Sequence, residues 1–125
     1  MPPHPQESGV DLFTDQVSAG VQRALDGVAE QQRTTAANIA NASTPGYRAQ
    51  TVSFQDSLLS AMSDGSDPSS APITTTDAGT PADLTGNTVQ LNTELTAQQK
   101  EGLQYQALAQ AMTFKLGLWQ KALDK

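Results

Sequence analysis

The sequence predicts an all-α fold in which long N-terminal and C-terminal helices pack as a coiled-coil-like hairpin around an irregular, partly disordered middle segment. Two observations support this prediction. Near both ends of the chain, apolar residues return at steps of three or four, the spacing that places them on one side of an α-helix. Between the ends, residues 63–83 consist almost entirely of small, polar and helix-breaking residues, which favour loops.

The predicted organisation is a single structural unit without internal repeats. The first five residues include three prolines, which cannot sustain a helix interior. We therefore predict, in chain order, a disordered tail (1–10), an N-terminal helix (11–43), a Pro-Gly turn with a short extended or helical segment (44–62), a flexible linker (63–83), and a C-terminal helix (84–125) that forms one structural unit with the N-terminal helix.

The composition limits the kinds of partner that the chain can have. The chain has 125 residues, of which 37% are hydrophobic, and its net charge is -6. A domain of this size buries only about two thirds of its unfolded surface, so we expect part of the stability to come from partners. The acidic balance repels a phosphate backbone, which argues against nucleic acid. No apolar stretch approaches the roughly 20 residues that span a bilayer, so we expect no direct membrane insertion.

The N-terminal helix is predicted from one amphipathic stripe. Val21, Val28 and Ile39 lie on its apolar side, and charged side chains occupy the opposite side. Gly20 and Gly27 weaken this helix by up to about 1 kcal/mol each relative to alanine. The helix should therefore depend on packing against another element.

The segment after this helix should turn sharply. Thr44-Pro45-Gly46-Tyr47 has the Pro-Gly centre of a type II turn, and proline disfavours helical geometry in the residue before it. A short extended piece should follow. Phe54, Leu58 and Met62 then lie at helical spacing and predict a brief helix with one apolar face.

The C-terminal helix shows the clearest periodic pattern in the chain. Apolar residues alternate steps of four and three over more than four heptads, with one glutamine and one glycine as exceptions. Such a register favours a coiled-coil seam over a merely amphipathic surface helix. The residues of this predicted seam are Leu91, Leu95, Gln98, Gly102, Tyr105, Ala109, Met112, Leu116, Trp119 and Leu123.

The sequence offers little material for catalysis. The chain has no cysteine, and its one histidine, His4, lies in the proline-rich start. The nearest pair of carboxylates, Asp64 and Asp67, lies in or beside the predicted linker, where a catalytic geometry cannot be held. We therefore predict that the protein is not an enzyme, and we expect no catalytic, cofactor-binding or metal-binding residues.

Two asparagines near the end of the N-terminal helix suggest a contact surface. Asn38 and Asn41 are three residues apart and share a helix face, and the small alanines beside them would let another backbone approach. Carboxamides donate and accept hydrogen bonds, which suits contacts with neighbouring chains. An equally good interpretation is that Asn41 only caps the helix and that Asn38 is solvated.

The segment Ala36–Tyr47 resembles the signature of the flagellar axial family of rod and hook proteins, Ala-x-Asn-Ile-Ala-Asn-x-x-Thr-Pro-Gly-Tyr. Within that family, Gly86–Val89 and Leu103–Ala107 are similar to the proximal rod subunits. The resemblance implies a subunit that stacks its terminal helices into the hollow tube of the basal-body rod. It also implies export through the flagellar type III apparatus without a cleaved signal peptide, a place in the periplasmic rod, and contacts with copies of itself and other rod or basal-body subunits.

The first hypothesis is therefore a structural rod subunit that acts by packing. A second is a soluble helical binding module, such as a secretion chaperone or adaptor, which predicts a stable closed dimer. A third, a small enzyme, needs an ordered linker and a pocket. Under the first hypothesis we expect these subunit-interface residues: Val21, Val28, Asn38, Ile39, Asn41, Pro45, Gly46, Tyr47, Leu95, Tyr105, Met112, Leu116, Trp119 and Leu123.

Overall fold

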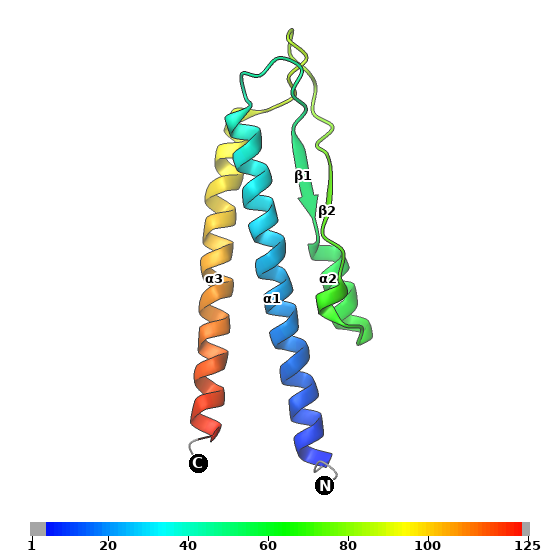
Figure 1. The fold of residues 1–125 in the computed structure, drawn as a ribbon, viewed down its shortest axis with the longest axis vertical. Helices are drawn as coiled ribbons and strands as arrows, with labels where there is room; N and C mark the ends of the chain where they lie inside the picture. The colour runs from blue at the N-terminus through cyan, green and yellow to red at the C-terminus, as the bar shows by residue number, and fades with distance from the viewer. Residues whose placement is uncertain (1–4, 124–125) are drawn as a thin grey trace.

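The computed structural model describes the backbone of residues 5–123 and the side chains of residues 16–118 and 120–123. Within this range the fold is mostly helical, with three α-helices, one short 3-10 helix and a small antiparallel sheet (Figure 1). In chain order the elements are α1 (Pro5–Ala40), β1 (Gln50–Ser53), α2 (Gln55–Asp64), η1 (Pro68–Ser70), β2 (Thr74–Asp77) and α3 (Leu91–Leu123).

The long helix α1 is the spine of the molecule. It contacts α2, α3, β1 and η1. Figure 1 shows α3 along one side of α1, and the sheet with α2 along another. The chain runs up α1 and down α3, so the start of α1 and the end of α3 lie at one end of the molecule, and the loops that join α1 to β1 and β2 to α3 lie at the other. At 36 residues, α1 is about 54 Å long.

The first turn of α1 corrects the prediction for the start of the chain. Residues 5–10 belong to the helix and not to a disordered tail, while residues 1–4 lie outside the described part. Proline is tolerated in the first turn of a helix, where its missing N–H has no partner to lose. Pro5 can therefore begin the helix that proline would interrupt elsewhere.

The glycines of α1 make room for α2. A Cβ atom on Gly27 would stand 2.5 Å from Cε1 of the Phe54 ring, and one on Gly20 would stand 2.8 Å from the Met62 sulfur. Phe54 is 3% exposed as a result of this close approach. The expected dependence of α1 on packing is thus explained, because the glycines that weaken the helix also admit an aromatic ring to its surface.

The predicted flexible linker is ordered within the structure, and the prediction of a purely helical fold is wrong here. In the sheet, β2 pairs antiparallel with β1, with Ser53 opposite Thr74. Its run of threonines favours a strand, because β-branched side chains fit an extended backbone. Before it, Asp67 caps η1 by accepting a hydrogen bond from Ser69 N at 3.0 Å. Arg23 of α1 holds the end of η1 by donating to Ala71 O at 2.9 Å.

The C-terminal helix begins later than predicted. Residues 84–90 form a loop with a turn, and α3 starts only at Leu91. The loop contains Gly86, which has a positive φ of 84° and lies against Gly46. A side chain at Gly86 would be strained by that φ, so this part of the chain could not continue the helix.

The buried core is small, in agreement with the composition. Its apolar members come from α1, β1, α2 and the segments beside them, and none is a described side chain of α3. Polar residues make up almost half of the buried set. The buried apolar residues are Val28, Ala49, Val52, Phe54, Ala61 and Ala71, and the buried polar residues are Thr35, Asn38, Asn87, Thr88 and Glu101.

The close contact between α1 and α2 predicts the effect of Gly27→Ala. The added methyl group would overlap the rigid Phe54 ring, so we expect a loss of about 1–3 kcal/mol in the free energy of unfolding. Urea denaturation followed by circular dichroism measures this loss.

Gly102→Ala is the matched control. A Cβ atom there meets nothing within 4 Å, so the same substitution should stabilise α3 by about 0.4–1 kcal/mol. If Gly27→Ala also stabilises the chain, the packing of Phe54 onto α1 is wrong.

Candidate subunit interface

The turn predicted after α1 is present. Tyr47 N donates to Thr44 O at 3.2 Å, and Gly46 has a φ of 76°. A positive φ at the third position is what a type II turn requires, and glycine adopts it without steric cost. Pro45 and Gly46 are exposed, and Tyr47 is half-buried. The turn therefore presents its tip to solvent at the end of the molecule opposite the termini.

Asn38 is held inside the chain. Its side chain is 1% exposed, its Nδ2 donates to Gln50 O at 2.8 Å, and its Oδ1 accepts from Gln50 N at 3.1 Å. This pair of bonds fixes the start of β1 against α1. Neither interpretation of the sequence anticipated this, since one expects Asn38 to contact a neighbouring chain and the other expects it to be solvated. This internal role could not be predicted from the local sequence, because the partner residue, Gln50, lies twelve residues away in the chain.

Asn41 ends α1. Its Nδ2 donates to Ala37 O at 2.8 Å, and its Oδ1 accepts from the Thr44 hydroxyl at 3.1 Å. The side chain thus gives a second partner to the Ala37 carbonyl, which already accepts from Asn41 N at 3.1 Å, and so closes the last helical turn. The capping interpretation of Asn41 is confirmed, and its half-buried side chain shares a surface with the exposed turn.

Asn87 is a residue that the sequence analysis missed. It is 3% exposed, and its Nδ2 donates to Asn41 O at 2.9 Å and to Thr44 O at 2.8 Å. Its Oδ1 accepts from Val89 N at 2.7 Å. One amide side chain therefore joins the end of α1 to the loop before α3. The available signal was the short run Gly86–Val89, which the sequence analysis used only as part of the family resemblance.

Thr88 completes this connection between the two loops. Its hydroxyl accepts from Ala49 N at 2.7 Å, its backbone N donates to Tyr47 O at 3.0 Å, and its side chain is 1% exposed. Nearby, Gly46 N donates to Thr85 O at 2.9 Å. We call these bonds, together with those of Asn38 and Asn87, the loop clamp. The loop clamp positions the exposed turn with respect to α1, β1 and α3.

The expected interface residues of α1 lie mostly inside the molecule. Val28 is 2% exposed, whereas Val21 and Ile39 are half-buried. Val21 and Val28 also line an apolar groove of about 490 Å³ that runs over α1 between α2 and α3. The other lining residues include Phe54, Leu58 and Met62 from β1–α2 and Leu108 from α3. The stripe predicted on α1 thus packs partly within the chain and partly faces this groove.

The predicted seam of α3 does not form the centre of the contact with α1. The side of α3 that meets α1 carries Ala97, Glu101 and Leu108. Seam residues are turned aside, since Leu116 is 58% exposed and Leu123 is 80% exposed. Leu95 and Tyr105 are also exposed, Met112 is half-buried, and the side chain of Trp119 lies outside the described part. The apolar register is real, but α1 leaves most of it uncovered.

A second apolar stripe lies on another side of α3. Leu103, Phe114 and Leu118 are 68%, 69% and 51% exposed. Spacings of eleven and four residues place them on one face, because eleven residues are close to three helical turns. Extended exposed apolar surfaces mark sites of interaction with other proteins or membranes. The helix α3 therefore presents two uncovered stripes, the seam and this Leu103–Leu118 stripe.

One exposed ion pair links the two strands of the sheet at their outer ends. Arg48 Nε lies 2.6 Å from Asp77 Oδ2 and joins the outer ends of β1 and β2. This hydrogen bond, followed by that from Gly79 N, lowers the pKa of the Asp77 carboxyl. Among the described side chains, those of residues 16–118 and 120–123, no group of three or more potential metal ligands gathers. Within residues 5–123, no helix is both long and apolar enough to span a membrane.

The buried hydrogen bonds of Asn38 predict the effect of Asn38→Ala. The substitution leaves both backbone groups of Gln50 without their buried partner, so we expect the free energy of unfolding to fall by about 1–3 kcal/mol. Chemical denaturation of the isolated chain measures the change.

Asn92→Ala is the control for the same chemical change at an exposed position of α3, and it should stay within about 0.5 kcal/mol of the parent chain. If the Asn38→Ala and Asn92→Ala variants are equally stable, the Asn38 side chain does not contribute to the loop clamp.

Comparison with known proteins identifies the family to which these features belong. Residues 22–48, which include the whole signature, match the family described as flagella basal body rod protein. Over 112 residues the chain is 35% identical to the flagellar basal body rod protein FlgB of Escherichia coli (strain K12), covering 74% of this chain and 81% of that protein. The FlgB protein of Shigella flexneri matches with the same identity and coverage. The resemblance drawn from the sequence is thus confirmed, and the chain belongs to the FlgB family as a structural flagellar basal body rod protein.

Proposed function

We propose that this chain is a proximal rod subunit that assembles by helix packing into the hollow tube of the flagellar drive shaft. The observation that carries the proposal is the uncovered apolar surface of α3, where large side chains at heptad spacing face solvent. An isolated chain gains nothing from such a surface. A subunit whose neighbours cover it gains about 1.5–3 kcal/mol for each large side chain that becomes buried.

The packing that we propose is coiled-coil-like and involves both uncovered stripes. The seam residues Leu95, Tyr105, Leu116 and Leu123 face one neighbouring helix, and Trp119 belongs to the same register. A different neighbour covers the Leu103–Leu118 stripe. Because two different surfaces of one helix then contact two different neighbours, the contact is heterologous, and a heterologous contact that does not close generates a helical assembly.

The exposed turn is the second part of the proposed interface. Pro45 and Gly46 are exposed at the end of the molecule away from the termini, and the loop clamp holds them rigidly. A rigid projection loses little conformational freedom when it binds. In this proposal the turn contacts a neighbour along the rod axis, with Tyr47 and Asn41 beside it, whereas Asn38 acts from inside by fixing the shape of the surface.

The neighbours are copies of this chain and other basal-body rod subunits, and the subunit reaches the periplasmic rod through the flagellar type III export apparatus without a cleaved signal peptide. The small buried core supports this route, because a domain with little buried apolar surface is marginally stable and unfolds readily for passage through a narrow channel.

We infer further that the subunit acts by packing and not by catalysis. The middle segment is ordered, which a small enzyme would need, but its carboxylates are engaged locally. Asp64 accepts from Ser66 N at 2.9 Å, and Asp67 accepts from Ser69 N at 3.0 Å. The pKa values of both carboxyls are lowered, first by hydrogen bonds from the side chains of Ser66 and Ser69 and then by these backbone hydrogen bonds, so neither is prepared to act as a general acid.

The proposed packing is tested by replacing two exposed seam residues, Leu116→Gln and Leu123→Gln together. Both side chains face solvent in the isolated chain, so we expect secretion and folding to remain normal. Losing two buried leucines in the rod should lower recovery of the subunit in purified basal bodies more than tenfold, since about 1.4 kcal/mol already corresponds to a factor of ten. Swimming in soft agar should be lost.

The matched control replaces two exposed residues between the stripes, Gln99→Ala and Gln110→Ala. This variant should swim normally. If the leucine variant is also recovered normally in basal bodies, the seam is not a rod interface.

The isolated chain should be a monomer at low concentration and form open-ended oligomers as its concentration rises. Light scattering across a concentration series, with circular dichroism on the same samples, measures both size and helix content. A dimer that neither dissociates nor grows would support the closed binding module instead.

A further inference from the structure

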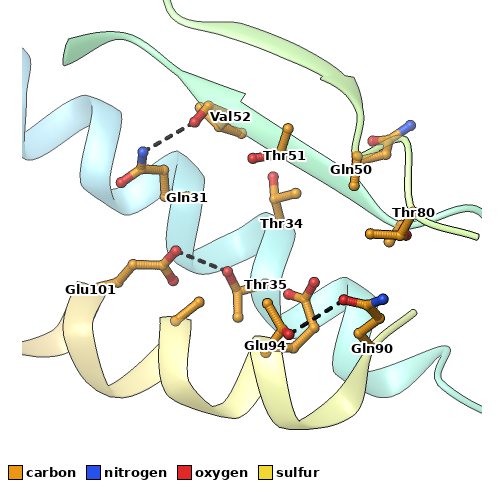
Figure 2. Close-up of a pocket in the computed structure, with 14 residues that line it drawn as sticks. Gln31, Thr34, Thr35, Gln50, Thr51, Val52, Thr80, Gln90, Glu94 and Glu101 are labelled. Atoms are coloured by element: carbon orange, nitrogen blue, oxygen red, sulfur yellow. Dashed lines mark hydrogen bonds between the residues drawn. The ribbon is translucent and has the colours of Figure 1, made fainter. Parts of the chain in front are cut away.

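A polar cavity of about 290 Å³ lies where α1, β1 and the first half of α3 meet. Figure 2 shows Gln31 and Thr35 on α1, Thr51 on β1, and Glu94 and Glu101 on α3 around it. Its volume is close to the lower end of the roughly 300–1,000 Å³ that small-ligand pockets occupy. Unlike the apolar groove, this cavity is lined mainly by threonine, glutamine and glutamate side chains.

Glu101 is the unusual member of this lining. It is 9% exposed, and its Oε2 accepts a hydrogen bond from the Thr35 hydroxyl at 3.0 Å. Its other oxygen, Oε1, is buried and has no hydrogen-bond partner. A carboxylate rarely loses its hydration without gaining a partner, because an unpaired buried charge strongly destabilises the fold. The free oxygen therefore points to a missing donor.

Among the described side chains, no ion pair compensates the charge of Glu101. Glu94 lies seven residues earlier, on the same side of α3, and lines the same cavity. The ion pairs among the described side chains join Arg23 to Asp26, Arg33 to Glu30 and Arg48 to Asp77, so none of them reaches this cavity.

The pKa of Glu101 is consistent with this arrangement. It is raised, first by burial and also by the charge of Glu94, while the Thr35 hydrogen bond and Lys100 act in the opposite direction. A bound cation would reverse the unfavourable part of this balance, because a nearby opposite charge stabilises the ionised carboxylate.

We propose that this cavity receives the ammonium group of a lysine side chain from a neighbouring rod subunit, with Glu101 and Glu94 as its counter-charges. The inference rests on the proposed function, since assembly brings the lysine to the cavity. An ammonium group is a compact charge with three donors, which suits one free oxygen of Glu101, the Glu94 carboxylate and a neutral oxygen of the lining.

A lysine fits this cavity better than the other common cations. Arginine binds best when both oxygens of one carboxylate face its planar fork, and Oε2 of Glu101 already accepts from Thr35. A divalent metal ion would need more ligands than the cavity offers, because no group of three or more acidic, histidine or cysteine residues gathers among the described side chains.

The test uses the unassembled full chain and n-butylammonium chloride, which has the length and charge of a lysine side chain. Nuclear magnetic resonance at pH 8 should show saturable shifts at Thr35, Gln50 and Glu101. The carboxyl pKa of Glu101, followed by its ¹³Cδ shift, should fall when the ammonium is present. Glu101→Gln should weaken binding at least tenfold, and Glu94→Gln should weaken it at least threefold.

Three comparisons decide the outcome. The neutral n-butanol should give no saturable shift. Glu30→Gln should bind n-butylammonium like the parent chain, because Glu30 lies away from the cavity and pairs with Arg33. Calcium chloride should not compete with n-butylammonium for the cavity. Equal binding of n-butanol, full retention of affinity in Glu101→Gln, or preferential binding of calcium would each overturn the proposal. Glu94→Gln keeps the test decisive if Glu101→Gln does not fold.

The source of the lysine is tested in assembled rods. A Glu94→Gln, Glu101→Gln double variant should be secreted normally and be recovered at least tenfold less in basal bodies, while Glu30→Gln is recovered normally. If the isolated chain binds n-butylammonium but the double variant assembles normally, the occupant is not a neighbouring subunit. The proposed rod function is tested separately by the leucine variants, so the two failures are distinguishable.

Discussion

The loop clamp is the interaction on which the rest of the structure depends. The amide of Asn87 binds two carbonyls at the end of α1, and the hydroxyl of Thr88 binds the backbone just before β1. Asn38 ties the first residue of β1 to α1. These side chains are almost fully buried, so removing one leaves buried backbone groups without partners. The clamp thereby sets the positions of β1 and of the start of α3 relative to the end of α1.

Below the clamp, the molecule is held by contacts on different sides of α1. Phe54 and Met62 approach the helix backbone at Gly27 and Gly20, where any larger side chain would collide. On another side, α3 contributes Ala97, Leu108 and Glu101, the last of which is bound to Thr35. The tight side of α1 is therefore the one that packs α2, while the contact with α3 leaves most large apolar side chains of that helix uncovered.

This imbalance connects the fold with its role in the rod. A protein that had to be stable alone would turn the leucines of α3 toward α1, where their burial would stabilise the monomer. Here Leu103, Leu116 and Leu123 remain exposed while a carboxylate lies in the helix contact. In the proposed rod, neighbouring subunits cover this apolar surface. The proposed contact at Glu101 adds a charge to that interface, and charge complementarity helps to determine which partner fits.

The sequence by itself determined the local features of this protein. Helical periodicity at both ends, the type II turn at residues 44–47 and the family signature all depend on residues close together in the chain. Tertiary structure alone decided which side of α3 meets α1, that residues 74–77 pair with β1, and that Asn38 binds inward. Each of these depends on contacts between distant segments, and an apolar stripe carries no information about which partner covers it. The cavity at Glu101 also depends on contacts between distant segments. In the sequence, Glu101 looks like an ordinary residue on the polar face of a helix, so the cavity could not be predicted.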